Sequence, residues 1–188
     1  MLRKILVFIF ALLCFTLSGC ATYKEIDRGY LVTTIGVQKT SDKATIFIEA
    51  LVSSDISNEK NKRIVLKGAG RDERHAYSNL KSMLVKPLYF EQLGTIVVDE
   101  QSNIDFLKDG ANLNLGVYLV KTSDVTSLFE NYTSSGVIGY DIIALVKTQQ
   151  KENNQKINNQ LYNLYSDEFT IPIVNLTDGN LILKTNEE

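Results

Sequence analysis

Few residues of this 188-residue chain have the types that catalysis or metal binding needs. His75 is the only histidine, and the helical spacing around it places it among polar side chains, so we interpret it as a solvent-exposed surface residue. A catalytic or metal-binding imidazole would need partners, and Cys14 and Cys20 are the only cysteines. The sequence therefore shows no group of acid, base and nucleophile, and it predicts a protein that is not an enzyme and has no cofactor.

Glycines between a predicted strand and a predicted helix raise the question of phosphate binding. Gly68 and Gly70 are spaced like the first two glycines of a dinucleotide-binding loop, but Glu73 occupies the position of the third. Asp72 would add negative charge where a phosphate docks. We interpret this segment as a structural strand-to-helix turn.

Two pairs of adjacent carboxylates are the remaining candidates for acid–base chemistry. Asp99-Glu100 and Asp167-Glu168 are typical of solvated ends of strands or helices, and nothing in the sequence brings the pairs together. The formal net charge of the whole chain is −2. This acidic balance gives no reason to expect a nucleic-acid partner.

The first residues have the architecture of a secretory leader. Arg3 and Lys4 precede the apolar segment 5–17, which as a helix rises about 20 Å and is too short for a hydrocarbon core of about 30 Å. Leu17-Ser18-Gly19-Cys20 follows and resembles the bacterial lipobox. The resemblance implies a lipoprotein signal peptide at 1–19 and, at Cys20, S-diacylglycerol attachment with N-acylation. Two acyl chains suffice for a stable membrane anchor.

Hydrophobic periodicity predicts the elements that follow. The predicted strands are 31–40, 43–54, 63–70, 94–100, 115–122, 169–176 and 180–186. The predicted helices are 71–87, 102–110, 123–132 and 139–150, with a polar loop or frayed helix end at 151–160 and a short helix around 161–165. Pro172 favours an edge position for its strand, or a position between structural units.

This order of elements predicts the fold class. Helices between strands indicate an α/β (mixed α+β) fold, with a mixed β-sheet covered by helices. We expect an opening β-hairpin over 31–54 and short extra strands at the C-terminus.

Five parts of the chain occur in a recognisable order. They are Lys24-Glu25-Ile26, Ile35-Gly36-Val37, GRDERHAYSNL at 70–80 with KPLYFEQLG at 86–94, IDFLKDGANLNLGVYLVKT at 104–122, and FTIPIVNL at 169–176. Together they resemble the C subunit of spore germinant receptors, the GerAC-like spore germination lipoproteins. Gln38 departs from the aspartate usual in that family, and members of the family are longer than this chain.

The resemblance implies a function and a division of the chain. Residues 20–168 would form the N-terminal α/β domain of such a lipoprotein, and 169–188 would be the truncated start of a second region. The protein would be a non-enzymatic, lipid-anchored accessory subunit of a nutrient receptor, acting in spore germination with integral membrane subunits. It would lie on the extracytoplasmic face, at the outer face of the spore inner membrane. Direct binding of a small-molecule germinant stays open. The alternative is a generic cell-surface lipoprotein that binds a solute or an envelope component, and a hydrolase with an unrecognised site is a third hypothesis.

Overall fold

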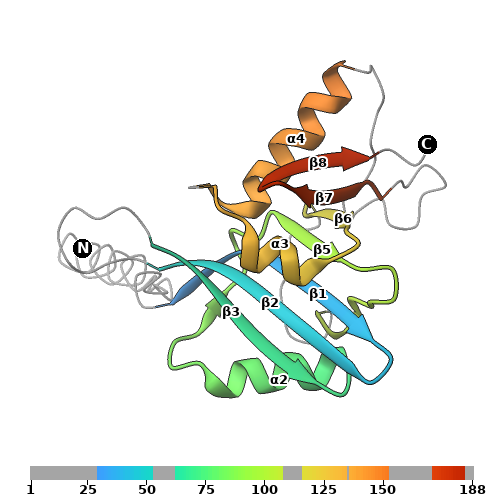
Figure 1. Ribbon diagram of the computed structural model, residues 1–188. Coiled ribbons are helices and arrows are strands. Elements are labelled where there is room, and N and C mark those ends of the chain that lie inside the picture. The colour runs from blue at the N-terminus through green and yellow to red at the C-terminus, as the bar shows by residue number, and fades with distance from the viewer. Residues whose placement is uncertain (1–28, 53–61, 108–115, 135, 153–170, 185–188) are drawn as a thin grey trace, which may run out of the picture.

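A single mixed β-sheet flanked by helices makes up the part of the chain that the computed structural model describes, residues 29–52, 62–107, 116–134, 136–152 and 171–184 (Figure 1). The elements, in chain order, are β1 (Tyr30–Thr40), β2 (Lys43–Val52), β3 (Lys62–Gly70), α2 (Glu73–Met83), β4 (Leu88–Tyr89), β5 (Thr95–Val98), the 3₁₀ helix η2 (Asp105–Leu107), β6 (Tyr118–Lys121), α3 (Val125–Asn131), α4 (Ile138–Glu152), β7 (Ile173–Thr177) and β8 (Asn180–Lys184). The predicted α/β (mixed α+β) class is confirmed.

The sheet has eight strands and is mixed. Its order is β3-β2-β1-β5-β6-β7-β8, and the short β4 pairs with the start of β1. β1, β2 and β3 are antiparallel neighbours, whereas β5 and β6 continue the sheet from β1 in parallel. The predicted opening hairpin is present, with Thr40 paired to Lys43 across its turn. β1 therefore lies inside the sheet and contacts both the antiparallel and the parallel part.

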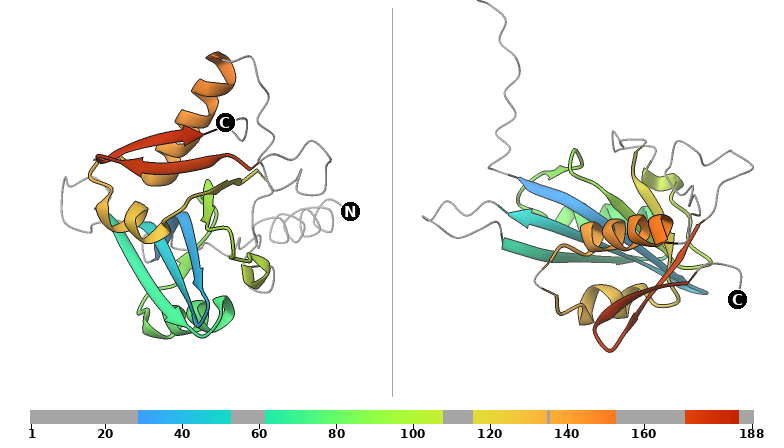
Figure 2. Two further views of the ribbon diagram at one scale, coloured as in Figure 1. Left: turned by 45° about the vertical axis from the view of Figure 1, so that its right-hand side comes forward. Right: turned by 90° about the horizontal axis from the view of Figure 1, so that it is seen from above.

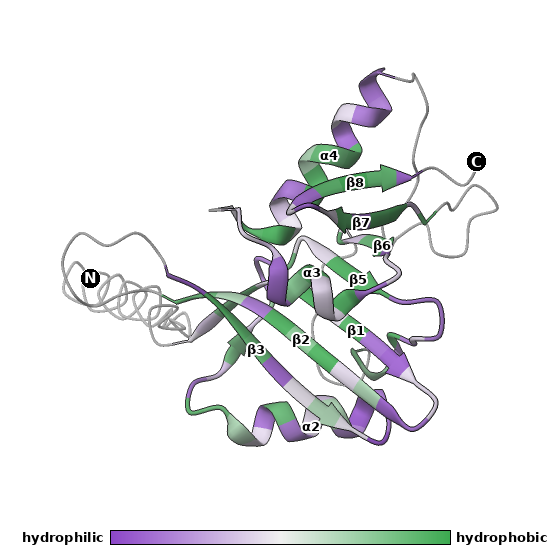
Figure 3. Cartoon of the chain, viewed as in Figure 1, coloured by the Kyte–Doolittle hydropathy of each residue, from purple (hydrophilic) through white to green (hydrophobic). Residues whose placement is uncertain are grey.

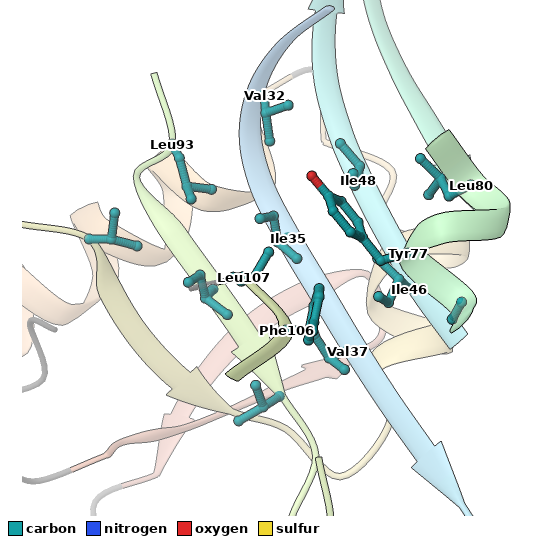
Figure 4. Packing of buried hydrophobic residues seen from close by; sticks show 14 of the residues in the cluster. Val32, Ile35, Val37, Ile46, Ile48, Tyr77, Leu80, Leu93, Phe106 and Leu107 are labelled. Atoms are coloured by element: carbon teal, nitrogen blue, oxygen red, sulfur yellow. The ribbon is translucent and has the colours of Figure 1, made fainter. Parts of the chain in front are cut away.

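Two hydrophobic clusters fill the two faces of this sheet. Along β2, Ile46 and Ile48 belong to the cluster covered by α2 and η2, while Phe47 between them belongs to the cluster covered by α3 and α4. This is the alternation expected of a strand that is buried on both faces. Figure 4 shows the first cluster, in which Tyr77 and Leu80 of α2 pack against β1 and β2.

Hydropathy follows this layered arrangement. Hydrophobic residues concentrate on the strands in the middle of the sheet, and the C-terminal turns of α4 are hydrophilic (Figure 3). The views of Figure 2 show α2 and α4 on opposite sides of the sheet. Both faces are thus covered by helices, as the sequence predicts.

The segment after α2 differs from the prediction. The helix ends at Met83 and Leu84 is extended, although the sequence favours a helix up to Pro87. Pro87 disfavours helical backbone at the residue before it, so the helix ends a turn earlier. The two-residue strand β4 then pairs with Tyr30 and Leu31, a non-local contact that local periodicity does not reveal.

Two further expectations are changed. The sequence predicts a helix over 102–110. Of these residues the structure describes 102–107, and they contain only the short 3₁₀ helix η2. β7 is not an edge strand, because it lies between β6 and β8. Pro172 precedes β7, so its missing N–H is not needed in the ladder, and its carbonyl accepts a hydrogen bond from Lys121 N at 2.9 Å.

Several predicted segments lie outside the described residues. They are the leader with Cys20, most of the loop after β2, the polar stretch from residue 153 on and the short helix around 161–165. The division of the chain at residue 169 stays a prediction.

Candidate functional site

A buried carboxylate on β2, that of Glu49, accepts hydrogen bonds from four other residues. The side chain of Glu49 is fully buried. Its Oε1 accepts hydrogen bonds from Arg63 Nε at 2.6 Å and Ile138 N at 3.0 Å, and its Oε2 accepts from the hydroxyls of Thr33 at 3.1 Å and Thr34 at 2.5 Å. Both oxygens are thus occupied by donors from four separate residues. We call these five residues the Glu49 cluster.

A β-bulge in β1 brings two consecutive threonines to the same carboxylate. The pairing of β1 with β2 shifts between Val32 and Thr34, so Thr33 is an extra residue. In a regular strand Thr33 and Thr34 would point to opposite faces. A bulge re-aims the side chain beside it, and here both hydroxyls reach Glu49.

The start of α4 contributes its free N–H groups to this cluster. Ile138 N binds Glu49, and Gly139 N donates to Thr34 Oγ1 at 2.9 Å. A negative charge at a helix N-terminus is favourable, because it satisfies N–H groups that have no partner within the helix. A side chain at Gly139 would place its Cβ 2.5 Å from Thr34 Oγ1, so glycine permits this close approach.

A second polar pair lies next to the cluster. The guanidinium of Arg63 lies 5.4 Å from the centre of the Tyr132 ring, and Tyr132 OH donates to Asp141 Oδ2 at 2.5 Å. Burial, and then the hydrogen bond to Asp141, raise the pKa of Tyr132 above its ordinary value. Asp141 is on α4, so this pair fixes the same helix as Glu49 does.

The geometry of the Glu49 cluster suits a structural role. A general acid or base must reach the proton it transfers, and Glu49 has no exposed surface and no free lone-pair direction. Across the described ranges, no group of three or more His, Cys, Asp and Glu side chains could hold a metal ion. The cluster joins β1, β2, β3 and α4, and it therefore fixes the start of α4 on the three antiparallel strands.

Comparison with known proteins assigns the chain to a family. The model of the family described as the spore germination protein N-terminal domain matches residues 22–176. The chain belongs to this family. Searches of curated proteins and of solved structures found no match. Membership supports a role in spore germination and confirms the resemblance drawn from the sequence motifs.

In this spore germination domain the motif residues are mainly core residues. Ala76 and Leu80 face the sheet from α2, and Phe106 and Leu107 of η2 are buried beside them. Gly36 of β1 lies against the ring of Phe129, and a Cβ there would overlap it. The motifs therefore encode packing, while Lys24-Glu25-Ile26 lies outside the described residues.

His75 is on the surface of the spore germination domain, as expected, but it has a partner. Asp72 is the N-cap of α2, and its Oδ1 accepts from His75 N at 2.8 Å and lies 2.7 Å from His75 Nδ1. The hydrogen bond from the His75 backbone N–H, with that of the ring, lowers the pKa of Asp72. The pair caps a helix, so its geometry has a structural explanation.

The strand-to-helix turn is structural, as the sequence predicts. A Cβ on Gly70 would overlap the backbone of α2 at His75 and Ala76, and one on Gly68 would lie 2.5 Å from Leu80 Cβ. Neither glycine has a positive φ, so close approach of the helix explains both. The N-terminus of α2 is occupied by its own cap, Asp72, where a phosphate would bind.

Of the two carboxylate pairs, the structure describes only Asp99-Glu100. Asp99 Oδ2 accepts from Lys39 N at 2.6 Å and Oδ1 accepts from Gln101 N at 3.0 Å, so this residue closes a local turn next to β1. Asp167-Glu168 and Cys20 lie outside the described residues. Sequence reasoning missed Glu49, although one signal was available: a single acid among the consecutive apolar residues of the predicted strand 43–54.

Within the described ranges, no helix is long and apolar enough to cross a membrane.

Proposed function

We propose that this protein is a non-enzymatic accessory subunit of a nutrient germinant receptor, anchored to the membrane through lipid on Cys20. The observation that carries the proposal is the match of residues 22–176 to the spore germination N-terminal domain, which begins two residues after Cys20 of the lipobox Leu17-Ser18-Gly19-Cys20. The partners would be integral membrane subunits of the receptor, and the site of action the outer face of the spore inner membrane. The non-enzymatic part of the proposal is supported by Glu49 and Asp141, two carboxylates that accept hydrogen bonds from groups of the domain itself.

A genetic experiment with a matched control tests this proposal. A deletion strain of a spore former is complemented with the wild-type chain, with Cys20→Ala, or with Cys14→Ala in the apolar segment of the leader. We expect Cys20→Ala to behave like the deletion in nutrient germination, measured by the loss of optical density of spore suspensions. Cys14→Ala should behave like the wild type. Mass spectrometry of the purified chain should find the acyl mass on an N-terminal Cys20.

The outcomes separate the proposal from its alternative. If Cys20 carries lipid but deletion leaves germination unchanged with every nutrient, and no membrane subunit co-purifies, the chain is a surface lipoprotein of another kind. An intact leader, or a mature N-terminus at another residue, contradicts the anchor itself.

A further inference from the structure

A groove opens between the C-terminal end of α2 and β4. It has a volume of about 390 Å³, and Leu84, Pro87, Leu88 and Phe90 supply its apolar lining, with Lys81 and Lys86 beside them. We call it the α2–β4 groove. It is distinct from the Glu49 cluster, which is held on the opposite face of the sheet by α4.

Large apolar side chains are exposed to solvent at the α2–β4 groove, which Val85 lines, and at the neighbouring end of α2, Met83. Val85 is 95% exposed and Met83 is 63% exposed, the two highest values among the large hydrophobic residues of the described ranges. Such exposure has no stabilising effect on the fold. Apolar side chains next to cationic ones are typical of a surface that lies in the interface of a bilayer.

The two lysines of the groove are available for an anionic partner. Within the described ranges neither Lys81 nor Lys86 forms an ion pair, and Lys81 Nζ lies 5.4 Å from the centre of the Tyr77 ring. Long lysine side chains can keep their charge at the level of lipid phosphates while their stems lie along apolar surface. The groove thus combines exposed apolar side chains with two lysines that form no ion pair with any described residue.

The chain enters the domain beside this groove. Tyr30 N donates to Pro87 O at 2.9 Å, and Tyr30 pairs with Leu88 at the start of β1. Figure 1 places the start of β1 and the C-terminal end of α2 at the same end of the molecule. Cys20 is nine residues before Gly29, so even a fully extended connection spans only about 30 Å. A lipid on Cys20 would keep the groove close to the bilayer.

We propose that the α2–β4 groove is the face with which the domain rests on an anionic lipid surface. Val85 and Met83 enter the headgroup region, and Lys81 and Lys86 contact lipid phosphates. The inference rests on the proposed attachment through Cys20. The lipid anchor holds the domain at the membrane, so the α2–β4 groove contacts lipid at a high effective concentration, and this contact can form even if its own affinity is low. Without residues 1–19, which hold Arg3 and Lys4 and no acid, the chain has 18 basic and 22 acidic residues and a formal net charge of −4, so attraction to an anionic surface must come from a local patch of positive charge such as this one.

The far end of the opening hairpin supplies a matched control position. Ser41 is exposed in the turn after β1, about 33 Å along the strand from Tyr30. If the α2–β4 groove faces the bilayer, Ser41 points away from it. Val85 and Ser41 therefore differ in predicted depth while both are exposed and make no core contacts.

Fluorescence in vesicles tests the orientation with the full chain. Val85→Cys or Ser41→Cys, each with Cys14→Ser, is labelled with an environment-sensitive fluorophore after purification from membranes. The chain is reconstituted in vesicles of phosphatidylcholine with or without phosphatidylglycerol, and lipid-borne nitroxide serves as quencher. We expect quenching at position 85, stronger with phosphatidylglycerol, and none at position 41. Adding Lys81→Gln and Lys86→Gln should lower the ratio of docked to undocked chains by about 30-fold, or about fivefold for each lysine.

Each outcome decides the inference. A chain that floats with the vesicles but shows equal quenching at both positions keeps the anchor and overturns the docking face. Quenching at position 85 that rises with protein density and not with anionic lipid identifies a second copy as the occupant, and also overturns it. A chain that does not float refutes the anchor, and the docking face with it.

Discussion

Replacing Arg63 with methionine should destabilise the protein strongly, because it leaves a buried carboxylate without its cation. Arg63 Nε donates to Glu49 Oε1 at 2.6 Å, and the side chains of Arg63 and Glu49 are 23% and 0% exposed. Breaking a buried pair by removing one partner costs about 3–5 kcal/mol. Three other donors remain on the carboxylate, so we expect the lower end, about 3 kcal/mol of unfolding free energy.

The partner variant Glu49→Gln should cost less. Its amide oxygen can still accept from Arg63 and Ile138, but its NH₂ group replaces the oxygen that accepts from Thr33 and Thr34. We expect a loss of about 2 kcal/mol. In the double variant the losses should fall short of additivity by about 1–2 kcal/mol, because both changes remove the same contact.

Urea denaturation followed by far-ultraviolet circular dichroism measures these changes, and the chain provides a control pair. Lys67 and Glu130 are 2.7 Å apart but half exposed, so Lys67→Met should cost at most about 1 kcal/mol and should matter less at high salt. The effect of Arg63→Met should persist at high salt. If Arg63→Met costs no more than Lys67→Met and its effect is additive with Glu49→Gln, the cluster does not stabilise the fold as argued.

Three further changes have expected outcomes. Gly70→Val should lower the free energy of unfolding by about 1–3 kcal/mol, since its side chain would overlap the backbone of α2; an unchanged thermal midpoint would contradict the close packing. Asp72→Asn should flatten the acid limb of a stability–pH profile: hydrogen bonds from His75 lower the pKa of Asp72, so its contribution is present above about pH 4 and is lost as pH falls through the folded value. Tyr132→Phe should make the fall of unfolding free energy at alkaline pH shallower. Burial and Asp141 raise the pKa of Tyr132, so above about pH 10 this tyrosine ionises more readily in the unfolded chain, and the wild type loses stability. Identical stability–pH profiles of the variant and the wild type would refute this role.

The sheet and its helices were largely predictable from the sequence because their signals are local. Ile46, Phe47 and Ile48 alternate between two buried faces over adjacent positions, and Ala76 and Leu80 share one face of a helix. Such patterns indicate which face of a strand or helix is apolar, whichever element packs against that face. They do not report pairing over long distances, which is why β4 and the interior position of β7 were missed.

The Glu49 cluster was not predictable for the same reason. Its hydrogen bonds join residues 14 positions apart at Arg63 and 89 positions apart at Ile138, and they depend on the bulge at Thr33. A bulge leaves no local mark in a strand of β-branched residues. The surface assignment of His75 succeeded because helical spacing decides it, while its partner Asp72 follows from cap geometry.

The way in which the last two strands join the sheet has a consequence for local opening. β7 and β8 form a hairpin closed by Asp178 and Gly179, both with positive φ, and pair with each other over five positions. β7 pairs with its other neighbour, β6, at one position only, Lys121 with Ile173. Amides of this hairpin should therefore exchange with solvent deuterium through a sub-global opening that leaves β1, β2 and β3 protected. A boundary in cooperativity would then lie within one continuous sheet, between β6 and β7, and the packing of Val174 and Leu183 in the cluster under α3 and α4 would set the free energy of this opening.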